Sequence, residues 1–81
     1  MRNVHPGEIL KDEIEYRRIS QRQLAKEIGM SYSVLNEILN CKRPVTTEFA
    51  LMIEAALSID HEPLLKMQSN YDVQMAKRDN T

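Results

Sequence analysis

The chain has 81 residues, of which 42% are hydrophobic and 28% are charged. A chain of this length buries only about 60% of its unfolded surface, so we expect a single domain spanning residues 1–81. No apolar run approaches the roughly 20 residues that span a bilayer, and the first six residues have no signal-peptide character. The single cysteine, Cys41, excludes an internal disulfide and a cysteine-based zinc site. These features predict a reduced, cytoplasmic protein with no membrane partner.

The charge balance is close to neutral, with 11 basic and 12 acidic residues and a net charge of −1. Residues 17–43 nevertheless contain six basic and two acidic side chains, whereas the segments on either side are net acidic. A positive block between acidic ends is the pattern that a phosphate-contacting surface requires. A randomly mixed solvated surface is also compatible with these counts.

The expected secondary structure is helical throughout, because no alternating β-branched run and no Asn-Gly or Asp-Gly hairpin turn occurs. Four helix starts have Ser, Thr or Asp as N-cap, with an apolar residue before the cap and another at the fourth helical position. The first helix begins at Pro6, where a missing N–H is tolerated, although His5 is a poor capping residue. We expect helices over residues 6–17, 21–28, 32–39, 47–57 and from 61 to about 76. Residues 4–76 form the expected ordered part, with 77–81 frayed.

Helical periodicity within these segments predicts an all-α fold with one apolar core. The side chains expected to face inward are Ile9, Leu10, Ile14, Val34, Leu35, Ile38, Phe49, Ala50, Ile53, Ala56 and Leu57. The last helix has more apolar side chains than so small a core needs, and methionine is common at adaptable interfaces. These side chains either complete the core or contact a second copy of the chain. We expect a homodimer interface formed by Leu64, Met67, Tyr71 and Met75.

Residues 21–40 have the pattern of a helix-turn-helix, in which two short helices meet across a turn that contains glycine. Ala25 is small enough for the second helix to cross closely, and Gly29 adopts positive φ at little cost. A plain corner between two helices, with no role in DNA binding, produces the same local pattern.

The polar face of the second of these helices favours DNA binding. A merely solvated helix face typically has Lys and Glu pairs, whereas this one has small hydroxyl and amide side chains. The Asn amide offers a donor and an acceptor together, which match N6 and N7 of adenine. Glu37 on the same face either accepts from cytosine or repels phosphate. The predicted base-contacting residues are Ser31, Tyr32, Ser33, Asn36 and Asn40.

Phosphate contacts are expected on either side of that face. Gln21 and Arg22 begin a helix, where free backbone N–H groups favour an anion. Lys42 and Arg43 follow the polar helix, within the positive block of the chain. Alternatively, Lys42 and Arg43 only provide positive charge that complements the helix dipole at the C-terminal end of the polar helix.

Catalysis and metal binding have little support in the sequence. His5, His61 and Cys41 lack the spacing of zinc ligands. The chain has two glycines and no nucleophile motif or glycine-rich phosphate loop. We therefore expect no catalytic residue, metal or cofactor, and a protein that is not an enzyme. Cys41 is either a redox-reactive thiol beside two cationic residues or an inert loop residue.

Three segments together resemble the HigA antitoxins, a branch of the XRE-like helix-turn-helix group that includes phage repressors. They are His5-Pro6-Gly7-Glu8-Ile9-Leu10, then Asn36-Glu37-Ile38-Leu39-Asn40 followed by Lys42-Arg43, and Gln68 with Tyr71-Asp72. The resemblance covers about residues 4–76. The chain departs from the family at Cys41, where glycine is common, and at Leu64, where an aromatic residue is frequent.

This resemblance implies a compact five-helix, lambda-repressor-like domain. It also implies a dimeric repressor that binds a palindromic double-stranded operator and autoregulates its operon. The second implied partner is a HigB-like toxin, an mRNA-cleaving RNase that the antitoxin neutralises. Two alternatives stay open: a phage-type regulator without a toxin partner, and a protein-only inhibitor that does not bind DNA.

Overall fold

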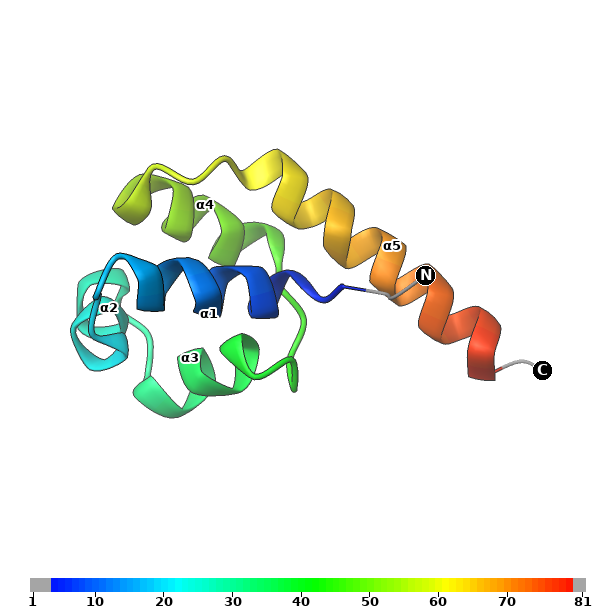
Figure 1. Ribbon diagram of the computed structural model, residues 1–81, viewed down its shortest axis with the longest axis horizontal. Helices are drawn as coiled ribbons and strands as arrows, with labels where there is room; N and C mark the ends of the chain where they lie inside the picture. The colour runs from blue at the N-terminus through cyan, green and yellow to red at the C-terminus, as the bar shows by residue number, and fades with distance from the viewer. Residues whose placement is uncertain (1–3, 80–81) are drawn as a thin grey trace.

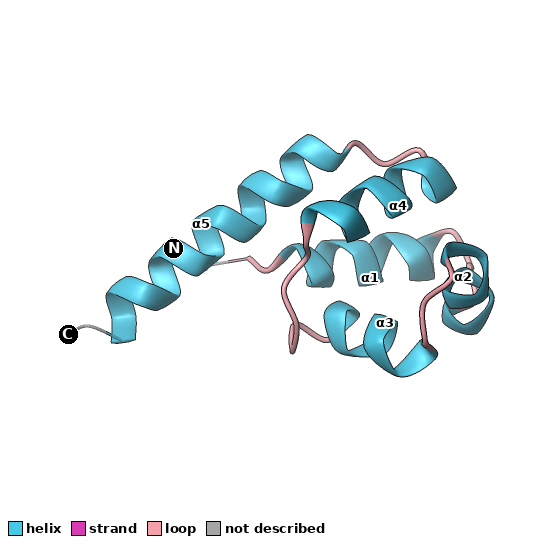
Figure 2. Cartoon of the chain, turned by 180° about the vertical axis from the view of Figure 1, so that it is seen from behind, coloured by secondary structure: helices cyan, strands magenta, loops and turns pink. Residues whose placement is uncertain are grey.

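The computed structural model describes residues 4–79, which form five α-helices and no strand (Figures 1 and 2). The helices are α1 (Pro6–Tyr16), α2 (Gln21–Ile28), α3 (Tyr32–Leu39), α4 (Thr47–Leu57) and α5 (His61–Asp79). In Figure 1, α1 crosses the middle of the molecule, with α4 above it, α3 below it and α2 at one end, while α5 descends from the top past the other end. The predicted all-α, five-helix fold is confirmed.

Side chains cap the helices where the sequence predicts it. Ser20, Ser31 and Thr46 each accept a hydrogen bond from the backbone N–H three residues later, at 3.2 to 3.3 Å. His5 also caps its helix, because its Nδ1 accepts from the backbone N–H of Gly7 at 2.9 Å. The expectation that His5 is a poor cap was wrong. An unprotonated imidazole nitrogen accepts a hydrogen bond, as the hydroxyl oxygen of a Ser or Thr cap does.

The turn of the helix-turn-helix has the predicted left-handed residue. Gly29 has φ of 70°, and its N–H bonds back to the carbonyl of Lys26. Cys41 has φ of 64° in the loop after α3. A side chain in this conformation costs roughly 1–2 kcal/mol, which explains why glycine is common here in the family that the chain resembles.

The core lies between all five helices and is apolar. Its buried members are Leu10, Ile14, Leu24, Ala25, Leu35, Ile38, Leu39, Val45, Phe49, Ala50, Ile53, Leu57 and Leu64. Two expected core residues are exposed instead, Ile9 at 43% and Ala56, while Val34 is half-buried and packs against the core. The two exposed residues lie at the edge of an apolar stripe, where the angle to the neighbouring helix decides burial and periodicity does not.

Two predicted helix boundaries also differ from the structure. The first helix ends at Tyr16, and Arg17 is its C-cap. The last helix continues through residues 77–79, which were expected to be frayed, while residues 80–81 lie outside the described part. Lys77 and Arg78 are in the last turn of α5, where positive charges interact favourably with the helix dipole and so stabilise the helix.

Gly7 permits a close approach that sequence reasoning did not identify. It is buried in the first turn of α1, against the last part of α3. A Cβ at this position would overlap the carbonyl oxygen of Ile38, a backbone atom. The predicted small residue, Ala25, is also buried, but the contact between α1 and α3 depends on Gly7.

Across residues 4–79, none of the helices combines the length and the apolar character that crossing a bilayer requires.

Candidate nucleic-acid interface

The helix α3 lies at the lower edge of the molecule in Figure 1, on the other side of α1 from α4. Ser31, Tyr32, Ser33 and Asn40 are exposed, and Asn36 is half-buried. The predicted base-contacting residues thus lie together along one accessible surface, which we call the α3 face. Ser31 has a second role, since its Oγ accepts from Val34 N and caps the helix.

The start of α2 contacts the α3 face directly. The Asn36 side-chain amide donates to Oε1 of Gln21 at 3.1 Å. Beside this pair, the guanidinium of Arg22 lies 4.2 Å from the centre of the Tyr32 ring, a cation–π distance. Two predicted phosphate-contacting residues are therefore next to two predicted base-contacting residues, and the two helices of the motif present one continuous polar surface.

A further cation, Lys11, reaches the end of the α3 face from α1. Its Nζ donates to Oδ1 of Asn40 at 3.0 Å, and Asn40 Nδ2 donates to the carbonyl of Asn36 at 2.8 Å. Sequence reasoning missed Lys11, because it belongs to the net acidic segment of residues 1–16, in which it is one of two cations.

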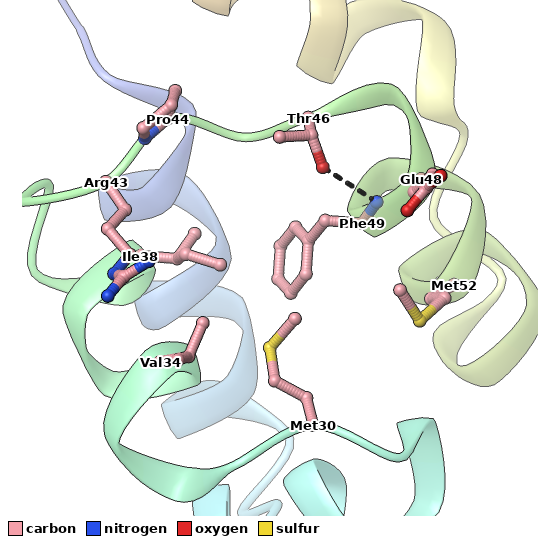
Figure 3. Close-up of a pocket in the computed structure, with 9 residues that line it drawn as sticks. All are labelled: Met30, Val34, Ile38, Arg43, Pro44, Thr46, Glu48, Phe49 and Met52. Atoms are coloured by element: carbon pink, nitrogen blue, oxygen red, sulfur yellow. Dashed lines mark hydrogen bonds between the residues drawn. The ribbon is translucent and has the colours of Figure 1, made fainter.

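The loop after α3 brings Arg43 to the same surface. Arg43 Nε lies 3.5 Å from Oε1 of Glu37, and both side chains are about half exposed. In Figure 3, the Arg43 side chain extends from the loop along α3 beside Ile38. Arg43 and Pro44 also border a small cavity between α3 and α4, where Phe49 lies at the centre of the view. Lys42, the neighbouring loop residue, is exposed.

Two buried polar side chains, His5 and Gln68, hold this loop in place. Gln68 Oε1 accepts from the backbone N–H of Val45 at 2.8 Å, and its amide donates to Asp72 at 2.8 Å. The His5 ring bonds to the backbone of Arg43 and meets the edge of the Tyr71 ring, with 4.9 Å between centroids. Burial lowers the pKa of His5 below its ordinary value, and this effect outweighs the opposing hydrogen bond and nearby carboxylates. The neutral ring is also the form that accepts the Gly7 N–H.

Replacing Gln68 by leucine is expected to destabilise the fold by about 1–3 kcal/mol, because the buried Val45 N–H loses its acceptor while side-chain volume is kept. Urea unfolding measures this free energy. The exposed Gln74 of the same helix gives the matched control, for which leucine is expected to change stability by less than about 0.5 kcal/mol. Equal stabilities of the two variants would show that the hydrogen bond does not stabilise the loop.

The four residues predicted for a dimer interface occupy different environments. Leu64 is 2% exposed and belongs to the core of its own chain, so it has almost no surface to offer a second copy. This corrects the prediction for Leu64, whose side chain faces inward on α5. Met67 packs against the same core, and Tyr71 contacts His5. Met75 is half-buried in the C-terminal part of α5. The C-terminal end of this helix runs beyond the other helices (Figure 1).

A second group of titratable side chains lies far from the α3 face, at the junction of α4 and α5. His61 Nδ1 lies 2.8 Å from Oε2 of Glu54 and 3.6 Å from Oδ1 of Asp60. The bond to Glu54 raises the pKa of His61, and the bonds from His61 lower the pKa of Glu54. The three side chains are close enough to share a metal ion. Glu54 also accepts the His61 backbone N–H at 2.9 Å, so it caps α5 in this structure.

The sequence profile of the helix-turn-helix family matches residues 10–64, which include the motif, the loop and most of the core. The chain belongs to this helix-turn-helix family. Virulence-associated protein I of Dichelobacter nodosus is 38% identical over 77 residues, which cover 94% of this chain and 71% of that protein.

Among solved structures, the chain is similar to HigA-type members of the family. A HigA-family addiction module antidote protein from Coxiella burnetii has a TM-score of 0.87 at 35% identity, over 98% of this chain and 87% of that one. The Pseudomonas aeruginosa antitoxin HigA, solved with the higBA promoter, has a TM-score of 0.89 at 29% identity, over 98% and 87%. The resemblance to HigA-type proteins of the XRE-like group is thereby confirmed.

Proposed function

We propose that this helix-turn-helix protein is a dimeric, sequence-specific repressor that also acts as the antitoxin of a HigB-like RNase. The observation that carries the DNA-binding part is the α3 face, where exposed amide and hydroxyl groups lie between the cations of α2 and of the loop. The P. aeruginosa HigA of the same fold was solved with a promoter, which supports operator binding here. The protein acts by binding, without a catalytic step or a cofactor.

In this proposal, α3 of each subunit enters the major groove of one half-site. Two half-sites about 34 Å apart then match the two-fold symmetry of the dimer. Tyr32, Ser33, Asn36 and Asn40 contact base edges, with Ser31 at the start of the helix. Gln21, Arg22 and Lys42 contact phosphates and set the register. Binding of this operator upstream of the protein's own gene would repress its transcription.

The antitoxin part follows from the HigA-type structural relatives, two of which are described as antidote or antitoxin. Inhibition of a HigB-like toxin tests this part of the proposal. Co-expression with a HigB-like RNase encoded beside its gene is expected to prevent mRNA cleavage, and the two proteins are expected to co-purify. Continued cleavage in the presence of the folded protein would refute this part and favour a stand-alone, phage-type regulator.

A mobility-shift assay with the DNA upstream of the gene tests the repressor part. We expect a discrete complex with this duplex and much weaker binding to a scrambled duplex at the same salt concentration. Inhibition of the RNase without any DNA complex would instead identify a protein-only inhibitor.

Replacing Asn36 by alanine is expected to reduce discrimination at one base position per half-site by about 1–3 kcal/mol, because its amide is proposed to contact one base edge. Titrations of duplexes that differ at single base pairs measure this loss. An exposed asparagine on α5, Asn70, supplies the control, and alanine there is expected to leave every affinity unchanged. A uniform loss across all sequences would show that Asn36 supports the fold or the register and does not contact a base.

A further inference from the structure

A carboxylate lies in the middle of the α3 face. Glu37 follows Ser33 by four residues and precedes Asn40 by three, so all three share one side of the helix. Its side chain is 41% exposed. An unpaired carboxylate on a surface that approaches DNA is repelled by phosphates, so its presence on this face requires a compensating contact.

Arg43 supplies that contact from the loop. Its Nε lies 3.5 Å from Glu37 Oε1, so the ion pair is made through Nε, and the Arg43 side chain is half exposed. The bond from Val45 N to Gln68 and the bond between His5 and the Arg43 backbone hold the loop at Arg43 and at Val45. Arg43 is therefore held beside Glu37, at a defined place on the α3 face.

The two groups have the hydrogen-bonding pattern of one base pair. In the major groove, guanine presents the O6 and N7 acceptors and cytosine presents an N4 donor. An arginine donates to the guanine acceptors, and a carboxylate accepts from cytosine N4. A phosphate-contacting arginine, by contrast, gains nothing from an adjacent carboxylate, which weakens its attraction to the backbone.

From this geometry we propose that Glu37 and Arg43 act together to read one G·C base pair in each half-site. Arg43 donates to guanine, while Glu37 orients Arg43 through one carboxylate oxygen and accepts from cytosine through the other. This inference rests on the proposed DNA-binding function. It replaces the phosphate contact that the sequence predicts for Arg43, and it gives Glu37 a defined role.

The test is selection of duplexes from a library with about 20 randomised base pairs, two half-sites of one helical turn each, by the full-length protein. Single-base-pair titrations of the selected duplex follow. For the unmodified protein, changing one G·C pair per half-site is expected to weaken binding by about 5- to 150-fold. Arg43→Lys keeps the charge but not the bidentate donors, and Glu37→Gln removes the carboxylate. Both variants are expected to lose the preference at that pair and to keep it elsewhere.

Lys42→Ala is the matched control in the same loop. It is expected to weaken binding to all sequences alike and to reduce the salt slope by about one, while the G·C preference stays intact. Circular dichroism shows whether each variant keeps its fold, and a variant that unfolds is replaced by Arg43→Gln or Glu37→Ala.

Folded variants that keep the G·C preference would overturn this inference while the proposed function stands. Uniform weakening by Arg43→Lys and Glu37→Gln would do the same, because it is the signature of a contact to phosphate. An unmodified protein that selects no sequence from the library would refute both.

Discussion

Replacing Gly7 by alanine is expected to destabilise the protein by about 3 kcal/mol, at the upper end of the usual cost of overpacking. The added Cβ would overlap the carbonyl oxygen of Ile38, a backbone atom that moves only if α1 and α3 separate. For a domain of this size, the loss corresponds to a fall in Tm of about 12–24 °C. Thermal unfolding followed by circular dichroism measures it.

Gly29 provides the internal comparison for this experiment. A Cβ at Gly29 meets no heavy atom within 4 Å, but its φ of 70° disfavours a side chain. The same substitution there is therefore expected to cost only the conformational penalty of about 1–2 kcal/mol. If Gly7→Ala proved no more destabilising than Gly29→Ala, the close approach of α1 to α3 would be wrong.

A charge at Met75 is expected to convert the proposed dimer into a monomer and to weaken binding to a palindromic duplex by about 100-fold or more. Met75 is half-buried in the C-terminal part of α5, and we propose that a second copy packs there. This end of the helix runs beyond the other helices (Figure 2). A monomer loses the effective concentration that links the two half-sites. Sedimentation equilibrium and titration of the duplex measure the two effects of Met75→Asp.

Gln74→Asp places a carboxylate at the neighbouring, exposed position of α5 and serves as the control. It is expected to remain dimeric and to bind the palindrome as the unmodified protein does. Binding of both variants to a duplex with one half-site is expected to be unchanged, since that complex needs one subunit. A Met75→Asp protein that sediments as a dimer would place the interface elsewhere.

Local sequence signals were enough to predict the helices. Caps at Ser20, Ser31 and Thr46 depend on contacts within one turn, and each lies where the sequence predicts it. The positive φ of Gly29 is likewise a local property. Burial at the edges of helices was less predictable, and Ile9 and Leu64 show why: each has apolar neighbours in sequence, but the packing angle exposes one and buries the other.

For the nucleic-acid interface too, local features were predictable from the sequence, whereas contacts between helices were not. The polar face of α3 follows from helical periodicity once the core positions are assigned. Periodicity does not predict which side chains contact the residues of α3, because these side chains come from other elements. They are Gln21 of α2, Lys11 of α1 and Arg43 of the loop. The role of His5 and Gln68 in holding that loop was also outside the reach of pattern reasoning, since both act across more than 20 residues of sequence.

The sequence by itself therefore determined the five helices, the turn at Gly29 and the polar character of α3, because these depend on interactions within a few residues. The tertiary structure alone decided that Gly7 allows α1 to touch α3 and that Arg43 lies against Glu37. Those contacts join segments 31 and six residues apart, and their geometry depends on how whole helices pack and on a loop anchored by distant side chains.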